Sequence, residues 1–313
     1  MKCMVTGAAG FIGSALVNTL AEKGYVVKAV THSSKPKHRI KNVEYVKGDI
    51  TDIDSLKPLV KDVEVVFHCA AHVKDYGPKK PFYDINVGGT KNLVEVCKNG
   101  DVKRFIFLSH IRYESNKRYG LYSKTKKIAE NVLLDEYKNN KLPIVIIRPG
   151  NVYGPGSTIW VLRNIESIKK NRITLVNHGN GIFLHTYIDN LIDALLLAME
   201  KPEAVGKDIN VTDGDYTVTY GKYFNDLAEL IGEKPITKNL SKTSAMIIAK
   251  IMIFLNKVLK IKPWVTPTAV NILTNEQKIS IEKAKEILGY RPKIDYEQGM
   301  KNIQEWLKKE SYI

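Results

Sequence analysis

The feature that most constrains this chain is a glycine-rich turn after its first apolar run. Residues 2–6 have the length and composition of a buried strand, and an amphipathic pattern begins about seven residues later. The turn between them reads Gly7, Ala8, Ala9, Gly10, Phe11, Ile12, Gly13. Gly7 permits a sharp turn, Gly10 lets a ligand approach the backbone, and Gly13 lets the helix pack on the strand. Because a helix N-terminus offers free N–H groups and partial positive charge, this turn predicts a dinucleotide-phosphate site.

Short β-branched runs alternate with helical patterns through the first half of the chain. The predicted strands are 2–6, 26–30, 43–47, 65–69, 105–109 and 144–148, and the helical stretches include 13–23, 87–99 and 123–138. This alternation predicts an α/β fold, a Rossmann-type doubly wound parallel sheet with ligands at the carboxyl ends of its strands. After Pro155 the pattern becomes mainly helical and ends in 282–288 and 296–309. We expect a dinucleotide-binding domain over 1–170, with a return around 183–212, and a smaller substrate lobe over 171–313.

Composition narrows the class of partner and the compartment. The formal net charge is +15, but the lysines are scattered along the chain, so we expect a solvated basic surface and no nucleic-acid partner. Cys3, Cys69 and Cys97 lie far apart, with no spacing typical of a disulfide framework or a metal site. The N-terminus lacks the long apolar core of a signal peptide. We therefore expect a cytoplasmic protein that binds no metal and acts on a small molecule.

The most apolar segment, 245–259, is interrupted by Lys250, Asn256 and Lys257 and is too short for a membrane span of about 20 residues. We expect a packed amphipathic helix there. A lid over an apolar substrate and a helix resting weakly on a membrane surface are the alternatives.

A second motif carries reaction chemistry. Tyr122 and Lys126 are four residues apart, so they share one face of the predicted helix 123–138 or its first turn. A cation beside a phenol favours the ionised form, which lowers the tyrosine pKa from about 10 toward the working pH. Such a tyrosine can exchange a proton with an alcohol or carbonyl oxygen while hydride moves to or from a nicotinamide. Taken alone, the pair is also typical of a helix surface; its place after the fifth predicted strand favours catalysis.

The choice of cofactor depends on the end of the second predicted strand. A carboxylate there would hold the ribose hydroxyls of NAD and repel the additional phosphate of NADP. The sequence instead reads Thr31, His32, Ser33, Ser34, Lys35, without an acid. Hydroxyls and cations suit a 2′-phosphate, so we expect NADP, with NAD as the alternative.

The GxxGxxG spacing and the YxxxK pair resemble the extended short-chain dehydrogenases/reductases, and the resemblance covers nearly the whole chain. Glu130 also matches the end of the family's YxxxK segment, and 86–92, NVGGTKN, resembles its helix-five motif. The segment 244–267 resembles the 3β-hydroxysteroid-dehydrogenase-like subgroup more than the compact sugar epimerases. The resemblance implies that Asp49 accepts a hydrogen bond from adenine, that a small-residue turn at 69–71 lies against the cofactor, and that the protein is a homodimer. The expected cofactor-binding residues are Gly7, Gly10, Phe11, Ile12, Gly13, Thr31, His32, Ser33, Lys35, Asp49, Ile50, Cys69, Ala70, Ala71, Asn86, Leu108, Tyr122, Lys126, Pro149, Asn151 and Val152.

One position departs from the family pattern. The family has a Ser or Thr after the fifth strand that bonds the reacting oxygen, whereas our alignment places His110 there and Ser109 one residue early. Either Ser109 takes the role through a shifted turn, or His110 donates the hydrogen bond, or activity is altered. The expected catalytic residues are therefore Tyr122, Lys126, Ser109 and His110.

The second half carries the substrate-side motifs. The string 148–156, RPGNVYGPG, resembles the family's crossing from cofactor lobe to substrate lobe, and 185–191 resembles its YVDN segment. We expect His110, Asn151, His185 and Tyr187 to contact substrate, and Asp189 to cap a helix. The resulting hypothesis is an NAD(P)-dependent oxidoreductase that interconverts a secondary alcohol and a ketone, with an apolar, sterol-like substrate conceivable. The alternatives are a nucleotide-sugar epimerase or dehydratase with tightly bound NAD, and a non-catalytic dinucleotide-binding regulator.

Overall fold

The structure is a computed structural model that describes residues 1–32, 40–98, 100–111, 120–140 and 142–313. Seven strands of the described residues form one parallel sheet in the order β10-β6-β5-β4-β1-β2-β3. Their bounds are β1 Lys2–Thr6, β2 Val26–Thr31, β3 Val43–Lys47, β4 Val65–His68, β5 Arg104–Leu108, β6 Ile144–Pro149 and β10 Asp208–Val211. The predicted Rossmann-type doubly wound sheet is confirmed, and the predicted strands agree with it to within about one residue.

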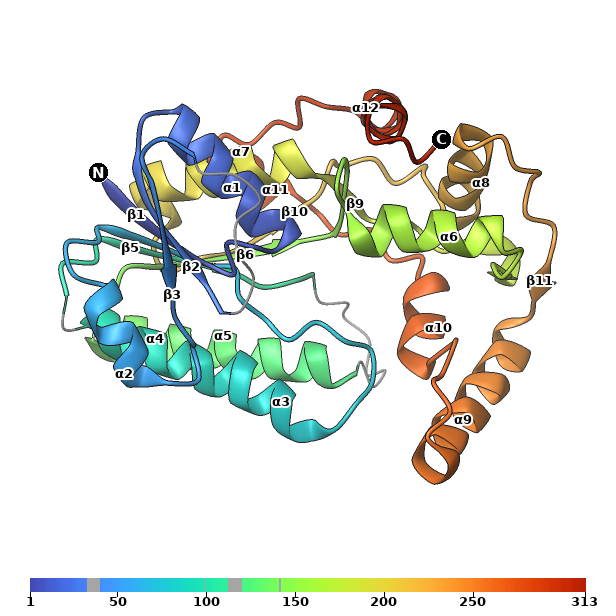
Figure 1. Ribbon diagram of the computed structural model, residues 1–313, viewed down its shortest axis with the longest axis horizontal. Helices are drawn as coiled ribbons and strands as arrows, with labels where there is room; N and C mark the ends of the chain where they lie inside the picture. The colour runs from blue at the N-terminus through green and yellow to red at the C-terminus, as the bar shows by residue number, and fades with distance from the viewer. Residues whose placement is uncertain (33–39, 99, 112–119, 141) are drawn as a thin grey trace.

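Helices cover both faces of this sheet (Figure 1). On one face α1, Phe11–Glu22, packs against α7, Ile188–Glu200. On the other lie α2, Ile53–Leu56, α4, Gly89–Lys98, and α5, Leu121–Asn140. Strands buried on both faces need apolar side chains in both directions, which is why β6 reads Ile-Val-Ile-Ile and is buried throughout. The two apolar layers on either side of the sheet form the main core.

The strand order reverses direction at β1, which has β2 on one side and β4 on the other. In open parallel sheets the ligand crevice forms at this reversal, outside the carboxyl ends of the strands. The glycine turn joins β1 to α1 at this point, so the topology places the predicted phosphate site at the expected crevice.

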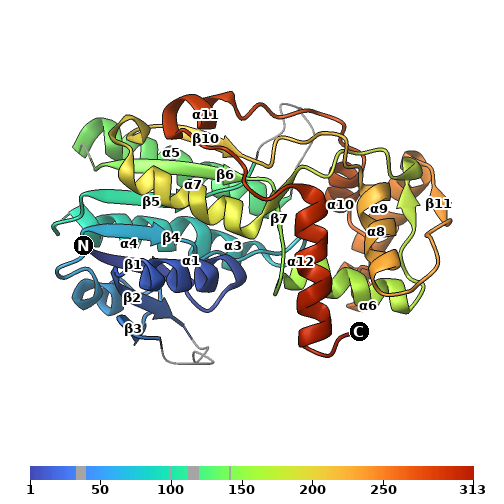
Figure 2. The ribbon, with the colours of Figure 1, turned by 90° about the horizontal axis from the view of Figure 1, so that it is seen from above.

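The second half contributes a smaller, mainly helical group of elements beside the sheet (Figure 2). It contains a short parallel pair, β7 Asn151–Tyr153 with β9 His185–Tyr187, and a second pair, β8 Leu175–Val176 with β11 Asn239–Leu240. Its helices are α6 Arg163–Lys169, α8 Tyr220–Leu230, α9 Lys242–Leu259, α10 Pro267–Leu273 and α12 Tyr296–Lys309, whereas α11 Glu282–Leu288 packs at the sheet beside β10 and α7. Short helical turns complete the described chain: α3 Lys79–Tyr83, η1 Lys57–Leu59, η2 Asp84–Gly88, η3 Thr158–Leu162, η4 Asn177–Gly179 and η5 Pro202–Ala204.

Two details of this half differ from or add to the sequence prediction. The N-cap of α7 is Tyr187, and Asp189 lies inside its first turn, so the expected capping role of Asp189 is wrong. Near the N-terminus a carboxylate still interacts favourably with the helix dipole.

The strand β10 brings the chain back to the edge of the sheet beside β6. The expected division of the chain near residue 170 stays a prediction. Among the described residues, no helix has the length and apolar character that crossing a bilayer requires.

Candidate active site

Most of the predicted cofactor residues lie at one edge of the sheet because they follow the carboxyl ends of parallel strands. Thr31 ends β2, Leu108 ends β5 and Pro149 ends β6. Asp49 and Ile50 follow β3 by two and three residues, and the turn 69–71 directly follows β4. The topology therefore collects these residues around the reversal point of the sheet, although they are spread over more than a hundred positions in sequence.

The glycine turn has the close contacts that the sequence predicts for a phosphate cradle. Gly7 has a φ of +69°, and a Cβ there would lie 2.8 Å from the backbone nitrogen of Ala70. A Cβ on Gly13 would lie 2.2 Å from the Gly7 carbonyl oxygen, so Gly13 is required for the contact between helix and strand. Gly10 is exposed at the N-cap of α1, where its own carbonyl accepts from Ser14 N–H. The turn thus presents bare backbone at a helix N-terminus, which fits a dinucleotide pyrophosphate.

The end of β2 faces the loop after β3. His32 Nε2 lies 3.3 Å from Asp49 Oδ2 in a largely exposed pair. The other Asp49 oxygen accepts from the backbone N–H and the hydroxyl of Thr51, at 2.8 and 2.7 Å, and these bonds lower the pKa of the Asp49 carboxyl. The predicted cofactor residues Ser33 and Lys35 lie outside the described residues.

The predicted catalytic pair occupies the first turns of α5. Tyr122 is half-buried, and Lys126, one turn later, is buried with its Nζ 3.7 Å from the centre of the Phe107 ring. Burial lowers the pKa of Lys126 to about 7, while the carboxylate of Glu130 opposes that shift. Lys126 therefore lies against apolar side chains beside β5, where its amine can gain or lose a proton near neutral pH.

The expected lowering of the tyrosine pKa is wrong for the protein on its own. Burial raises the pKa of Tyr122 to about 12, because the apolar surroundings disfavour the phenolate. The ammonium of Lys126 contacts the Phe107 face, so its charge does not offset this desolvation. Tyr122 is consequently a neutral phenol at pH 7, ready to donate a proton.

His110 lies directly against Tyr122. The two rings have centroids 5.1 Å apart and are tilted by 52°. The Nε2 of His110 is 2.7 Å from the hydroxyl of Ser123, the residue after Tyr122. The structure therefore brings together the imidazole, the phenol and a hydroxyl that the sequence analysis did not single out. The signal for Ser123 was its adjacency to the catalytic tyrosine, which orients it toward the loop after β5.

Ser109 belongs to a different, buried network. Its hydroxyl donates to Glu130 at 2.5 Å, and Glu130 also accepts from Arg148 Nε at 2.9 Å and Nη2 at 2.6 Å. Arg148 in turn pairs with Asp208 on β10. The Ser109 hydroxyl is thus bonded to Glu130, whereas the His110 ring lies against Tyr122; which of the two serves the reacting oxygen stays a prediction. Glu130, the last residue of the family motif, joins α5 to β5 and β6.

A continuous series of hydrogen bonds connects the phosphate turn with the catalytic helix. Thr90 donates to the Asn86 carbonyl at 2.8 Å, so it accepts from His68 Nε2 at 3.0 Å. His68 Nδ1 then accepts from Thr6, at 2.8 Å, and Thr6 accepts from Ala70 N–H at 3.3 Å. Burial lowers the pKa of His68 to about 3, which keeps the ring neutral and this order of donors fixed.

Asn86 completes the connection from within η2, a π-helical turn that precedes α4. Its Nδ2 donates to Thr125 at 3.0 Å, and Thr125 donates to the backbone carbonyl of Tyr122 at 3.0 Å. Its Oδ1 accepts from the backbone N–H of His72 at 2.7 Å. Asn86 is therefore a positioning residue that ties the turn after β4 to the helix of Tyr122.

The substrate-side string lies over the start of α1. A Cβ on Gly156 would be 3.8 Å from the Phe11 ring, which places the two segments in contact. Asn151 donates its side-chain amide to the hydroxyl of Tyr220 at 2.9 Å, and its backbone N–H to Leu184 O at 2.6 Å. Val152 is buried beside it, whereas Asn151 stays half-buried.

His185 and Tyr187 do not face a cleft, and the expectation that both contact substrate is corrected here. They are 1% and 2% exposed and lie in an aromatic cluster around Tyr153. Tyr187 accepts from Asn302 at 3.0 Å, and His185 pairs through Nδ1 with the carbonyl of Phe183 at 2.9 Å. Alternation in the short β9 directs both side chains into packing between the lobes, so their roles are structural.

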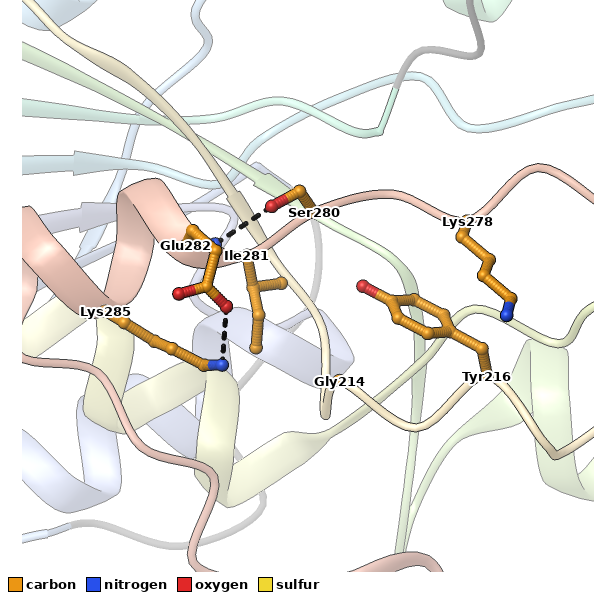
Figure 3. A pocket seen from close by; sticks show the side chains of 7 residues that line it. All are labelled: Gly214, Tyr216, Lys278, Ser280, Ile281, Glu282 and Lys285. Atoms are coloured by element: carbon orange, nitrogen blue, oxygen red, sulfur yellow. Dashed lines mark hydrogen bonds and ion pairs between the residues drawn. The ribbon is translucent and has the colours of Figure 1, made fainter.

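A cavity of about 320 Å³ lies elsewhere, beyond the β10 edge of the sheet. Figure 3 shows its lining of Gly214, Tyr216, Lys278, Ser280, Ile281, Glu282 and Lys285. Its polar groups bond to their own neighbours, as Lys285 does to Glu282 at 2.6 Å and Tyr216 does to the Ile279 carbonyl at 2.6 Å. Of the described residues that line it, none is a predicted site residue.

Comparison with known proteins identifies the family. Residues 3–212 match the NAD dependent epimerase/dehydratase family. The chain is 29% identical to a 2-alkyl-3-oxoalkanoate reductase of Stenotrophomonas maltophilia, with 97% of this chain and 98% of that protein covered. It is 27% identical to the decarboxylating sterol-4-alpha-carboxylate 3-dehydrogenase of Mus musculus, over 96% and 89%. The UDP-glucose 4-epimerase of Thermotoga maritima, solved with UDP-glucose, superposes with a TM-score of 0.79 at 25% identity, covering 99% and 100%.

The chain therefore belongs to the NAD dependent epimerase/dehydratase family, within the extended short-chain dehydrogenases/reductases, and its likeness to hydroxysteroid dehydrogenases agrees with the subgroup that the sequence indicated. The prediction of a nicotinamide-dinucleotide-dependent oxidoreductase is confirmed at the level of this class.

Proposed function

We propose that this protein is a dehydrogenase or reductase that interconverts an apolar secondary alcohol and its ketone. The observation that carries the proposal is the cluster of Tyr122, His110 and Lys126 at the carboxyl end of β5, beside the phosphate turn. The dinucleotide, held by the turn 7–13 and the loops after β3 and β4, supplies or accepts the hydride when bound. Tyr122 then donates a proton to the substrate oxygen, or takes one from it in the reverse direction.

In this proposal His110 holds the reacting oxygen. The hydroxyl of Ser123, 2.7 Å from Nε2, orients the imidazole, and the ring lies against Tyr122. An imidazole N–H can donate the hydrogen bond that a serine or threonine hydroxyl gives in the family. Lys126, one helical turn away, is buried against Phe107 and has a pKa of about 7, so in this proposal it takes part in proton exchange and does not lower the pKa of Tyr122.

The curated relatives indicate the substrate class. One name places a ketone two carbons from a carboxylate on an alkyl chain, and the other places oxidation at the sterol carbon next to the one that bears a carboxylate. A ring or chain that is apolar and carries oxygen at the carbon β to a carboxylate is common to both. We propose a β-keto or β-hydroxy acid of this kind as the substrate.

The test is an absorbance assay of NADPH and NADH consumption with a panel of 2-alkyl-3-oxoalkanoates and with apolar ketones that lack the carboxylate. We expect net oxidation of the cofactor, and a loss of kcat of about 100-fold or more in Tyr122→Phe. Unchanged turnover in Tyr122→Phe would refute the mechanism. Tyr119→Phe serves as the matched control, because this nearby tyrosine is followed four residues later by Ser123 instead of a lysine.

The second candidate is a nucleotide-sugar epimerase or dehydratase. The superposition on the epimerase solved with UDP-glucose favours it, together with the resemblance of the string 148–156 to the family's crossing between lobes. Such an enzyme would convert UDP-glucose without net change in free NAD(P)H, which the same assay distinguishes when product sugars are also analysed. A regulator without activity would bind dinucleotide yet convert neither class of substrate.

We also propose that NADP is preferred over NAD, because β2 ends at Thr31 and is followed by His32, with no carboxylate at either position. Calorimetric titration of each dinucleotide tests this directly. His32→Asp should weaken NADP binding and strengthen NAD binding, each by about tenfold, since it restores an acid beside the ribose. Equal affinities in the natural protein would contradict the preference.

Three further proposals rest on the sequence and on family resemblance. The first is a cytoplasmic location, with which the free thiols of Cys3, Cys69 and Cys97 are compatible. Homodimerisation can be measured by light scattering on the purified protein. The division into a cofactor domain over 1–170 and a substrate lobe over 171–313 can be tested by limited proteolysis.

A further inference from the structure

The helix α9 and the loop after it carry an unusual concentration of exposed apolar side chains. Phe254 and Trp264 are each 63% exposed. The other large apolar residues exposed in this segment are Ile247, Ile251, Val258, Leu259 and Ile261. Figure 1 shows α9 at the lower end of the smaller lobe, next to α10 and apart from the sheet. Contiguous apolar surface of this kind is characteristic of interaction sites.

The exposed residues form a defined face. Ile247, Ile251, Phe254 and Val258 are spaced by four, three and four residues, so they lie in one stripe along α9. The opposite face is the packed one: Ala245 and Ala249 are buried against Val176 and Val270. The helix therefore packs inward through small residues and turns its large apolar residues to the outside.

Charge identifies what would cover this face. From Lys234 to Asn275 the sequence contains seven lysines and no acidic residue. Lys250 and Lys257 are exposed on α9 and lie four residues before and three residues after Phe254, on the flank of the apolar stripe. A second copy docked on this face would bring two lysine clusters together. A surface with negative charge outside and an apolar layer beneath it would match both the flanking lysines and the apolar stripe.

We propose that α9 and the loop through Trp264, here called the α9 surface, dock on the surface of an anionic lipid bilayer. The apolar stripe enters the acyl boundary, and the flanking lysines contact the anionic headgroups. This binding is peripheral and reversible. It needs no change in the described fold, because the stripe and the lysines already face outward.

The α9 surface is connected to the candidate active site through α10. A seven-residue connection joins α9 to α10, and α10 lies against the start of the catalytic helix: a Cβ on Gly120 would be 2.9 Å from the hydroxyl of Thr268. Docking would thus hold the start of the helix that carries Tyr122 close to the bilayer, where an apolar substrate dissolves. This last step rests on the proposed function, whereas lipid binding itself does not.

The experiment is co-sedimentation of the full chain with vesicles of phosphatidylcholine, alone or mixed with phosphatidylglycerol. We expect binding to the anionic vesicles to be at least about tenfold stronger and to weaken as salt is raised. Lys250→Gln/Lys257→Gln should reduce it about tenfold, and Ile251→Gln/Phe254→Gln should abolish it. Lys301→Gln/Lys308→Gln is the matched control, because it removes two exposed lysines with the same spacing from α12.

Two readouts separate docking from loss of fold or activity. Circular dichroism and thermal melting should be unchanged in every variant, and the lysine variant, which leaves all apolar packing intact, keeps the test decisive if the apolar variant unfolds. The emission of Trp264 should shift to the blue on anionic vesicles, compared with Trp264→Phe. Failure to bind anionic vesicles, equal loss in the α12 control, or self-association that only the α9 variants abolish would each overturn the proposal. Turnover of a water-soluble ketone should be the same in all variants, so a failed substrate assignment is recognised separately.

Discussion

At the scale of single residues, the departure at position 110 determines how the site can work. His110 replaces a small hydroxyl with a larger ring that bonds Ser123 and contacts Tyr122. Ser109, one residue earlier, is 3% exposed and bonded to Glu130. Sequence reasoning could place both residues beside the site but could not choose between them, because successive residues at the end of a strand point to opposite sides.

The two residues should therefore respond differently to truncation. His110→Ala should lower kcat by about 10- to 100-fold with little effect on stability, since it removes a contact to the reacting oxygen. Ser109→Ala should leave kcat within about threefold but lower the free energy of unfolding by about 1–3 kcal/mol, because a buried carboxylate loses a donor. Steady-state kinetics and urea denaturation measure both, and the reverse pattern would return the role to Ser109.

Lys126 should cost stability at neutral pH. Its pKa is about 7 in the folded protein and about 10.4 when unfolded, so the unfolded chain binds more protons between these values. Stability should therefore rise with pH across this window, and Lys126→Met should remove that rise.

We expect Lys126→Met to be more stable than the natural protein at pH 7 by more than about 1 kcal/mol. The difference should be largest at and below pH 7 and should shrink toward pH 10. Urea titrations at pH 6, 7, 9 and 10 test this prediction, and a constant difference across the series would show that Lys126 is not titrating in the folded state.

At the scale of elements, the glycine turn joins β1 to α1 through contacts that differ from glycine to glycine. A Cβ on Gly13 would lie 2.2 Å from the Gly7 carbonyl oxygen. A Cβ on Gly10 would lie 3.2 Å from the same oxygen, on the exposed side of the turn. The sequence predicted this division of roles because each glycine had a fixed place relative to the strand and helix. It predicted a return to the dinucleotide-binding domain around 183–212 but did not single out β10, whose four residues alternate in burial and lack a long apolar run.

Gly13→Ala should lower the free energy of unfolding by about 2 kcal/mol or more, since backbone must move to admit the methyl group. Gly10→Ala should keep nearly natural stability and lose at least about tenfold in affinity for NADP and NAD, because the methyl group covers the backbone that the pyrophosphate approaches. Thermal melts and calorimetry check the pair. Natural dinucleotide affinity in a folded Gly10→Ala variant would argue against the phosphate site.

At the scale of the whole molecule, one buried ion-pair network joins four elements that sequence patterns treat separately. Glu130 on α5 accepts from Ser109 after β5 and from Arg148 on β6, and Arg148 pairs with Asp208 on β10. Alternating strands and helices predicted a parallel sheet, but contacts between residues 18 to 60 positions apart leave no local pattern. The burial of His185 and Tyr187 was missed for the same reason, because it depends on Tyr153 and Tyr296, which come from other segments.

Glu130→Gln should lower the free energy of unfolding by about 3–5 kcal/mol, because Arg148 would keep its buried charge without its main partner. Lys283→Gln, which removes the exposed partner of Asp208, should change it by less than about 1 kcal/mol. Urea denaturation compares the two variants. A small effect of Glu130→Gln would show that Asp208 alone compensates the charge of Arg148.

The series of hydrogen bonds through His68 has one order of donors, and each hydroxyl in it can point only one way. Thr6, at the end of the strand that precedes the phosphate turn, thereby sets which nitrogen of His68 accepts and which donates, and Thr90 then donates to the Asn86 backbone carbonyl. The Asn86 side-chain amide, which bonds Thr125, is a donor in either case. Thr6→Val would preserve the shape of the side chain but remove its hydrogen bond to Nδ1, so the His68 ring would be free to flip. The turn after β4, which lies against the phosphate turn, and the helix of Tyr122 are thus held by one set of buried polar contacts, from Thr6 at one end to Thr125 at the other.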